Sequence, residues 1–277
     1  MRDRAAIRAR VEGLTKVVTI PAGVERITAK INSGTATAAE IAADIGEDQV
    51  LAAKVLKLVN SGFYGFRQPI TTITHALVML GLDVVKNLVL TASVMDLVDA
   101  MNQKMAGLWL HSIGTARAAS AIAERLDVPN PEEHALSGLL HDVGKVVIAQ
   151  VFPADYQRIT AVVADRGCLQ LEAEQEVLGV THAEVGFWLL RKWALPDKLV
   201  YPIAYHHAFH PRRDHADRTA IVHVADILCR ALAIGYPGDR RIPPPHPEAL
   251  ALLDLDVAAV EAICQQLDAD LSVGSFA

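Results

Sequence analysis

Residues 105–127 read MAGLWLHSIGTARAASAIAERLD, a stretch rich in alanine, which is the residue that most favours an α-helix. The whole chain has this character, since 43 of its 277 residues are alanine and no useful length alternates apolar with polar residues. We therefore expect an all-α protein. Apolar residues make up 52% of the chain and charged residues 21%, a composition that can bury a sizeable core and excludes disorder of the whole chain.

Caps and breaks outline the helices around this segment. Thr37 with Glu40, and Thr181 with Glu184, have the spacing of capping boxes. The polar spacer 100–104 predicts a loop, and we place there the boundary between an N-terminal helical half, 1–104, and a C-terminal helical half, 105–277. In the second half we expect helices near 131–141, 154–165, 182–194, 197–208 and 216–234, and a last pair after the proline-rich segment 243–247.

Charge and cysteine content narrow the class of protein. The 26 Lys and Arg against 32 Asp and Glu give a net charge of −6, which argues against a nucleic-acid partner; we interpret the arginines among residues 2–10 as a solvated helix face. The three cysteines are scattered and form no CxxC, which fits a reducing compartment. The most apolar stretch, 70–98, carries several charges, and no signal peptide is evident. We therefore expect a cytoplasmic protein without a membrane partner.

Histidines are concentrated in the C-terminal half, where nine of the eleven lie between His111 and His223. His141 and Asp142 stand in the apolar segment 138–145, GLLHDVGK. Adjacent residues of a regular helix point about 100° apart, so this pair converges on one centre only near a helix end, which Gly144 would provide. An imidazole beside a carboxylate is a good ligand pair for Mn, Fe, Co, Ni or Zn. The alternative is a helix terminus capped by the two side chains.

Other polar residues interrupt apolar helices in the same half. Asp226 lies at the centre of 221–228, IVHVADIL, where a carboxylate needs a cation, either a metal or Arg230 one turn later. His111 alone fits a hydrogen-bonded core histidine, and His182 alone fits an exposed helix cap. Taken in chain order, the set is His111, His141-Asp142, His182, His206-His207 and Asp226.

This ordered set resembles the HD superfamily of metal-dependent phosphohydrolases, whose signature is a helical histidine, an adjacent His-Asp pair and a distant Asp. The additional histidines resemble the HD-GYP branch, in which they build a second metal site. The GYP element of that branch does not follow the histidine pair here. Gly235-Tyr236-Pro237 comes only after Asp226, in the wrong order, and we interpret it as coincidental.

The N-terminal half is similar to the HDOD domain, a bacterial signalling module related to HD-GYP. The segments that carry this similarity are 51–65 (LAAKVLKLVNSGFYG), Pro69-Ile70 and 75–81 (HALVMLG). The chain is thus identified as an HDOD member over roughly 14–235. The resemblance implies a multi-helix HD-superfamily-like bundle with an N-terminal helical HDOD subdomain. Many HDOD proteins are described as having lost the metal ligands, whereas this chain retains the set.

The resemblance also implies a dinuclear site in which Asp142 bridges two divalent metal ions. His111, His141 and Asp226 would hold one ion, and His182, His206 and His207 the other. Such a pair activates water and clamps a phosphoryl oxygen. Lys145 would offset phosphate charge, and Arg212 and Arg213 would reach in from the loop after His210; the alternative for these arginines is an ordinary solvated loop.

Several functions follow from the resemblance. The first is a bacterial signal-transduction protein with a signalling protein partner and with phosphohydrolase or phosphodiesterase activity on a nucleotide or cyclic dinucleotide. The second is a catalytically inactive scaffold whose metal is structural or senses a ligand. A third is a pocket that binds a nucleotide or another anion without cleaving it.

Overall fold

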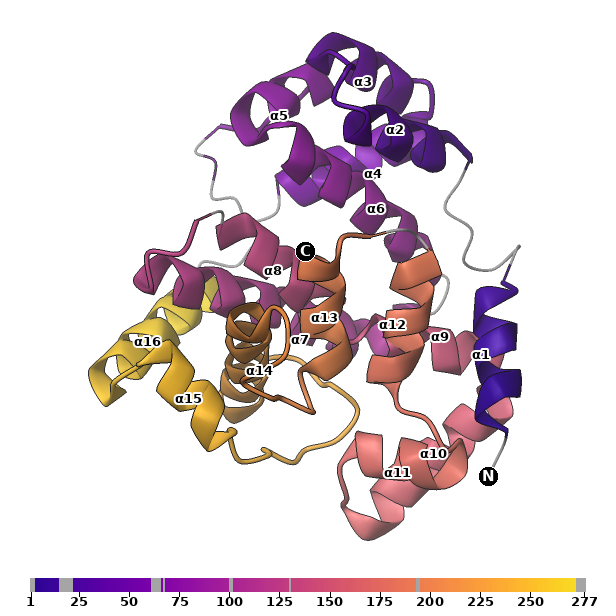
Figure 1. The fold of residues 1–277 in the computed structure, drawn as a ribbon, viewed down its shortest axis with the longest axis vertical. Helices are drawn as coiled ribbons and strands as arrows, with labels where there is room; N and C mark the ends of the chain where they lie inside the picture. Colours follow the sequence, from indigo (N-terminus) through magenta and orange to yellow (C-terminus); the bar gives the residue numbers. More distant parts are fainter. Residues whose placement is uncertain are drawn as a thin grey trace. The chain divides into compact units, whose positions relative to one another are not determined.

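The structure, a computed structural model, describes residues 3–14, 22–60, 66, 68–99, 102–129, 131–192 and 195–272. Within these ranges every regular element is an α-helix and none is a strand (Figure 1). The prediction of an all-α fold is confirmed. By packing, the chain divides into two compact units, which we call the first unit (15–101 with 270–277) and the second unit (1–14 with 102–269).

The helices are distributed between the units as follows. The first unit contains α2 (Ala22–Asn32), α3 (Ala38–Gly46), α4 (Gln49–Val59), α5 (Ile73–Leu80) and α6 (Leu82–Asp99). The second contains α1 (Arg4–Glu12), α7 (Asn102–Arg125), α8 (Pro131–Leu140), α9 (Val143–Val151), α10 (Pro153–Arg166), α11 (Gln170–Val177), α12 (His182–Lys192), α13 (Asp197–Tyr205), α14 (Ala216–Ala231), α15 (Pro247–Leu253) and most of α16 (Val257–Ser272).

Side-chain to main-chain hydrogen bonds fix the turns of the first unit. Asn60 follows α4, and its amide makes both hydrogen bonds of Ile70: Nδ2 donates to the carbonyl oxygen and Oδ1 accepts from the N–H, each at 2.7 Å. This pair ties the end of α4 to the segment before α5, which explains an Asn at this position. Gly81 then ends α5 with φ of +82°, a value that favours glycine. The neighbouring residues 61–65 lie outside the described residues.

The two predicted capping boxes are confirmed. Thr37 precedes α3, and its main-chain N–H donates to Glu40 while the Glu40 N–H donates to the Thr37 hydroxyl. Thr181 and Glu184 exchange the same two bonds ahead of α12, at 2.9 and 3.5 Å. Each box satisfies two free amides of a first helical turn, so a local sequence signal sets where these helices begin.

The alanine-rich α7 lies at the centre of the second unit, packed against α8 and α14. Small residues allow these helices to approach closely. Ala118 and Ala119 are fully buried, and a Cβ added to Gly138 of α8 would lie 2.8 Å from the Thr115 carbonyl oxygen of α7. Protein interiors are packed too densely to absorb such an overlap. The alanines therefore favour helix formation, and the alanines and glycines also make the close packing of these helices possible.

Gly144 departs from its expected role. It does not end a helix; α8 ends at Leu140, and Gly144 lies in the first turn of α9. A Cβ on Gly144 would lie 1.9 Å from the His182 carbonyl oxygen, so the glycine is required where α9 crosses α12. The predicted break itself is present, because His141 and Asp142 form the turn between α8 and α9.

Two further differences concern the boundary near residue 100. The spacer 100–104 is not wholly a loop, since α7 begins at Asn102, while residues 100 and 101 lie outside the described residues. The N-terminal helix α1 packs with the second unit, through an Arg4–Glu184 ion pair at 2.7 Å and a 2.7 Å hydrogen bond from Lys192 Nζ to the Leu14 carbonyl oxygen. The division of function between 1–104 and 105–277 stays a prediction.

No single helix within the described ranges is both long enough and apolar enough to cross a membrane. Two consecutive segments, Glu133–Val151 and Pro153–Arg166, are together long and apolar enough to span a membrane. The chain bends by 118° at the break between them.

Candidate metal centre

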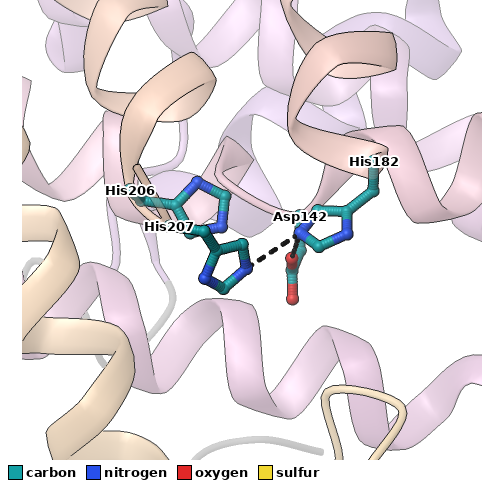
Figure 2. Close-up of side chains that lie close together, drawn as sticks. All are labelled: Asp142, His182, His206 and His207. Atoms are coloured by element: carbon teal, nitrogen blue, oxygen red, sulfur yellow. Dashed lines mark hydrogen bonds and ion pairs between the residues drawn. The ribbon is translucent and has the colours of Figure 1, made fainter. Parts of the chain in front are cut away.

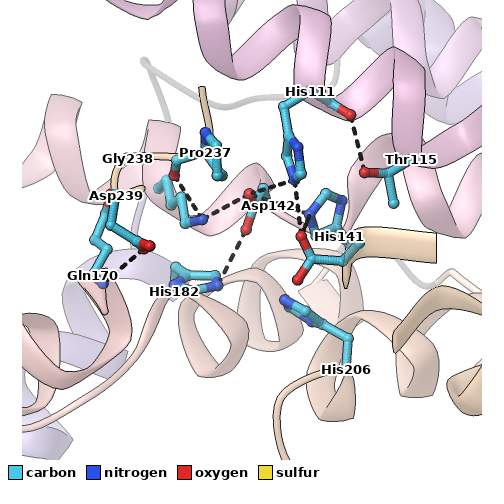
Figure 3. Close-up of polar contacts among 12 residues, drawn as sticks. His111, Thr115, His141, Asp142, Gln170, His182, His206, Pro237, Gly238 and Asp239 are labelled. Carbon is cyan, nitrogen blue, oxygen red and sulfur yellow. Dashed lines mark hydrogen bonds and ion pairs between the residues drawn. The ribbon is translucent and has the colours of Figure 1, made fainter. Parts of the chain in front are cut away.

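Seven predicted ligands from five parts of the second unit meet in one cluster. α7 supplies His111, the α8–α9 turn supplies His141 and Asp142, α12 supplies His182 at its first residue, the turn after α13 supplies His206 and His207, and α14 supplies Asp226. Figures 2 and 3 show the side chains of the six residues other than Asp226 pointing toward one another. Six of the seven are at most 2% exposed, and His207 alone is partly exposed.

The cluster contains two groups of ligand atoms. One group is His111, His141 and Asp226; the other is Asp142, His182, His206 and His207. Within each group the ring nitrogens and carboxylate oxygens lie within 4.8 Å of one another.

Asp142 connects the two groups because its carboxylate oxygens face opposite ways. Oδ1 lies 3.1 Å from His182 Nε2. Oδ2 lies 3.2 Å from His141 Nε2 and 3.9 Å from His111 Nε2. A single carboxylate thus lies between two sets of imidazoles.

Main-chain carbonyls fix which ring nitrogen faces the cluster in two of the histidines. His141 Nδ1 lies 2.6 Å from the Gly138 carbonyl oxygen, and His206 Nδ1 lies 2.8 Å from that of Ile203. A nitrogen this close to a carbonyl oxygen carries the proton and donates it, so Nε2 of each ring keeps its lone pair. Both Nε2 atoms are buried and have no hydrogen-bond partner.

A carboxylate plays the same orienting role for His182. Glu174 is fully buried, and its Oε2 accepts hydrogen bonds from the His182 main-chain N–H and from Nδ1, each at 2.7 Å. His182 Nε2 then faces Asp142 Oδ1 at 3.1 Å and His207 Nε2 at 3.1 Å (Figure 2). Either a proton or a metal ion has to lie among these atoms, because bare lone pairs at such distances repel one another.

Asp226 lies between the ligands and a buried arginine. Its Oδ1 is 3.0 Å from His111 Nε2 and 2.9 Å from Arg230 Nε. The salt bridge that the sequence offered as the alternative to a metal is therefore formed, and the carboxylate faces the imidazoles at the same time. Arg230 also reaches Asp239 at 3.1 Å, so its charge is shared between two carboxylates.

Burial and neighbouring charges set the protonation states. Burial opposes ionisation of Asp142, but electrostatic interaction with His141, followed by that with Lys145, outweighs burial and holds the pKa of the carboxyl well below its ordinary value. For Asp226 the same burial is outweighed mainly by Arg230, and its pKa also lies well below the ordinary value.

Three of the cluster imidazoles shift toward the neutral form. Burial, followed by repulsion from neighbouring histidines, lowers the pKa of His206 and His207 well below the ordinary value. Burial also lowers the pKa of His111. In His182 burial acts in the same direction, but the Glu174 carboxylate reverses it and raises the pKa. Charged carboxylates beside neutral imidazoles are the protonation states that bind divalent metals.

These residues fit a divalent cation. Unpartnered buried polar atoms are rare because each costs free energy, and here they are ring nitrogens with fixed tautomers aimed at two ionised carboxylates. Imidazole and carboxylate together suit Mn, Fe, Co, Ni and Zn. The donor set therefore suggests a divalent metal.

The remaining predicted residues lie in different positions. Lys145 is buried beside the cluster, where its Nζ donates to Asp142 Oδ2 at 2.7 Å and to the Pro237 carbonyl oxygen at 2.9 Å. Arg212 and Arg213 lie on the exposed loop after His210. The Arg213 guanidinium stacks over the Tyr205 ring at 3.5 Å. Within the described residues, no hydrogen bond or ion pair joins either arginine to the cluster.

The segment 233–241, which follows α14, covers one side of the cluster, and we call it the strap. Pro237 receives the hydrogen bond from Lys145 (Figure 3). The Tyr236 N–H donates to the Gly107 carbonyl oxygen of α7 at 2.7 Å. Gly235 has φ of +68°, and a Cβ there would lie 2.3 Å from the His111 main-chain nitrogen. The Gly-Tyr-Pro sequence thus packs directly on α7, the helix that carries His111.

A chain of polar contacts runs behind the ligands and was not predicted. Glu174 Oε1 accepts from Gln170 Nε2 at 2.8 Å. The Gln170 N–H donates to Asp239 Oδ2 at 2.9 Å (Figure 3), and Asp239 Oδ1 meets Arg230, the partner of Asp226. His182 and Asp226, which belong to different ligand groups, are therefore joined through buried side chains. Outer contacts of this kind orient metal ligands.

Comparison with known proteins identifies the family and the fold. The family model described as HDOD domain matches residues 17–209. A crystal structure of an HDOD domain protein with unknown function from Geobacter sulfurreducens superimposes with a TM-score of 0.76 at 29% identity, covering 97% of this chain and 96% of that one. A protein from Shewanella amazonensis SB2B, provisionally described as a phosphohydrolase, has the same fold, with a TM-score of 0.73 at 24% identity over 96% and 94% of the two chains.

A curated relative is an uncharacterised protein of Treponema pallidum (strain Nichols), 25% identical over 230 residues and 82% of this chain. The chain spans 44% of the length of that relative. The family match covers more than half of the chain, including most of the first unit and four of the five parts that carry cluster residues. The chain belongs to the HDOD family.

Proposed function

We propose that this protein is a bacterial signal-transduction HDOD protein with a dinuclear metal site, which regulates or binds a protein partner and acts as a phosphohydrolase or phosphodiesterase on a nucleotide-type substrate. One observation carries the proposal. The two oxygens of Asp142 face separate groups of buried imidazoles, among them His141 and His206, whose Nε2 lone pairs have no hydrogen-bond partner.

Each ion has its own donors in this proposal. His111, His141 and Asp226 would hold one, and His182, His206 and His207 the other, with Asp142 shared. When bound, such a pair of Fe, Mn, Ni, Co or Zn ions supplies water activation and charge neutralisation for phosphoryl transfer.

The chain contributes rigid orientation. Backbone carbonyls hold the rings of His141 and His206, and Glu174 holds His182, so little rearrangement is needed when cations bind. Lys145 supplies a fixed positive charge beside Asp142. A phosphate ester would approach from the side of His207, because that ligand alone is partly exposed. Arg212 and Arg213, on the exposed loop that follows, are proposed to meet its charge.

A second candidate function is a catalytically inactive signalling scaffold with a structural or ligand-sensing metal. The burial of the centre favours it. Asp142 is 1% exposed, and the equally buried Lys145 joins it to the strap at Pro237. A structural metal needs no substrate access, whereas hydrolysis needs a path to the bridging carboxylate.

Metal content and turnover separate these functions. Metal would be measured by mass spectrometry in wild type, in Asp142→Ala, and in Asp165→Ala as a control that removes an exposed carboxylate of α10. The proposal expects more than one ion per chain in wild type and in the control, and a loss in Asp142→Ala. Less than one ion per chain, unchanged by Asp142→Ala, contradicts the metal site.

Turnover is then assayed on a generic phosphodiester, on nucleotides and on cyclic dinucleotides, with Mn or Fe added. Hydrolysis that disappears in Asp142→Ala and persists in Asp165→Ala supports the enzyme. Bound metal without turnover of any of these esters supports the scaffold.

A further inference from the structure

A cavity of about 420 Å³ opens on the strap, outside the metal centre. Its lining includes Arg230, Tyr236, Pro237, Asp239, Arg240 and Arg241. None of the cluster ligands lines it. Sites for small molecules have volumes of roughly 300–1,000 Å³, so the cavity has room for a ligand of nucleotide size.

The lining is cationic although the chain as a whole carries a net charge of −6. Three of the lining residues are arginines and one is an aspartate. That aspartate, Asp239, is already satisfied, since its oxygens accept from Arg230 Nη1 at 3.1 Å, from the Arg241 N–H at 2.9 Å and from the Gln170 N–H at 2.9 Å. The positive charge of Arg240 and Arg241 is therefore not cancelled inside the cavity.

Arg240 and Arg241 have no ion pair with any carboxylate of the described residues. Arg241 is held in place by a 2.7 Å hydrogen bond from its Nε to the Gly167 carbonyl oxygen, which leaves its terminal nitrogens to bind an anion. Both side chains are exposed at the cavity rim. Two neighbouring guanidinium groups without a carboxylate partner are suited to phosphate, which accepts paired N–H donors.

Tyr236 supplies an aromatic surface in the same cavity. Its hydroxyl donates to the Gly238 carbonyl oxygen at 3.0 Å, and its side chain is 47% exposed. A large aromatic ring that is anchored at its hydroxyl and open to solvent offers a face on which a planar ring can stack. The combination of arginines and an anchored aromatic ring favours a phosphate group attached to a planar ring over a bare carboxylate.

We propose that this cavity is a second ligand site, distinct from the metal centre, which binds a phosphate-bearing small molecule of the nucleotide type through Arg240, Arg241 and Tyr236. Two of its walls touch residues that hold the metal ligands. Arg230 is bonded to Asp226, and Pro237 is bonded to Lys145. An occupant would thus lie beside the groups that position Asp226 and Asp142.

Calorimetric titration of the full chain in metal-free buffer at low salt tests the site, with inorganic pyrophosphate, AMP and adenosine as probes. The proposal expects one pyrophosphate or AMP per chain and no adenosine binding. Arg240→Gln/Arg241→Gln should weaken both phosphate probes about tenfold or more, since it removes charge-assisted hydrogen bonds. Tyr236→Ala should weaken AMP more than pyrophosphate. Arg125→Gln/Arg191→Gln makes the same change of charge at two exposed positions that do not line the cavity, and it should leave affinity within about twofold.

A fourth variant keeps this proposal separate from the metal centre. Asp142→Asn removes the shared carboxylate but touches no residue that lines the cavity, and it should bind both phosphate probes as wild type does. Loss of binding in Asp142→Asn, or unchanged binding in Arg240→Gln/Arg241→Gln, would overturn the second site. Circular dichroism of each variant confirms that it is folded. Absence of metal in wild type would contradict the proposed function, whereas the titrations would still decide whether the second site exists.

Discussion

Glu174 holds His182 twice through one carboxylate oxygen, which accepts from the main-chain N–H and from ring Nδ1 at 2.7 Å each. The first bond fixes the start of α12 and the second fixes the ring, so that Nε2 points at Asp142. A single buried carboxylate of α11 therefore sets both the position and the tautomer of a proposed ligand. Ligands oriented in this way bind metal more tightly than free imidazoles.

Replacing Glu174 is expected to weaken metal binding. Glu174→Ala removes the acceptor for Nδ1–H, and loss of such a contact costs about 10- to 100-fold in metal affinity. Glu174→Gln keeps an acceptor oxygen, so its metal affinity should lie between that of Glu174→Ala and that of wild type. Competition of Mn or Zn against a fluorescent chelator measures the effect. Glu176→Ala, on the exposed side of the same helix, is the control; equal affinities of Glu174→Ala and Glu176→Ala would contradict the role.

Bound metal is expected to replace Lys145 in stabilising the Asp142 carboxylate. Lys145 and Asp142 are each 1% exposed and paired at 2.7 Å, and breaking a buried pair costs about 3–5 kcal/mol. In chelator-treated protein, Lys145→Met should lower the free energy of unfolding by that amount, because Asp142 loses its nearest cation. Added Mn should restore a large part of it.

Urea unfolding with and without Mn measures this compensation. Arg166→Met is the control, since Arg166 pairs with Glu176 at the surface, where both side chains are more than half exposed, and loss of this pair should cost about 1 kcal/mol or less. A deficit in Lys145→Met that is the same with and without metal would show that no cation takes over beside Asp142.

Gly144→Ala is expected to destabilise the second unit strongly. The new Cβ would lie 1.9 Å from the His182 carbonyl oxygen, which cannot move without moving the start of α12. Overpacking typically costs about 1–3 kcal/mol, and contact with main chain puts this variant at the upper end. Gly186→Ala is a matched control at the same helix pair, because its Cβ would make ordinary contacts at 3.4–3.6 Å. Thermal unfolding of both variants tests the difference; equal midpoints would contradict the close approach.

His134 is expected to make stability depend on pH. Burial lowers its pKa to about 4 from an ordinary 6.5, so the unfolded chain binds the proton more tightly than the folded one. Above about pH 6.5 His134 is neutral in both states and does not lower the free energy of unfolding. As the pH falls from about 6.5 toward about 4, protonation of His134 in the unfolded chain lowers the free energy of unfolding by at most about 3 kcal/mol.

The free energy of unfolding of His134→Leu should therefore fall less between pH 6.5 and pH 4 than that of wild type. Urea titrations at the two pH values measure the slope, and His210→Leu, which removes an exposed histidine of the same unit, is the control. Identical slopes for wild type and His134→Leu would exclude His134 as the source.

The sequence alone singles out the residues of the cluster because they look out of place locally. Asp226 stands within IVHVADIL, and His141 and Asp142 within GLLHDVGK, so polar side chains on apolar helices are visible without a structure. The helix starts at Thr37 and Thr181 are equally local, since a capping box spans four residues. Family resemblance then predicts that these scattered residues share one site.

The contacts behind the ligands could not be predicted in the same way. Glu174 stands in the polar run 170–176, QLEAEQE, where nothing distinguishes it from the exposed Glu172 and Glu176. Asp239 likewise looks like a loop residue. Their roles arise from burial by segments distant in sequence. Gly144 shows the same limit: its sequence suggests a helix end, whereas the crossing of α9 and α12 requires it.

Anomalous diffraction from crystals grown with Mn tests the shared role of Asp142 most directly. A dinuclear site predicts two manganese peaks on either side of the Asp142 carboxylate, one beside His111, His141 and Asp226, the other beside His182, His206 and His207. Both should weaken or vanish in Asp142→Ala. A single peak, or no peak within reach of Asp142, would contradict a dinuclear site bridged by this residue.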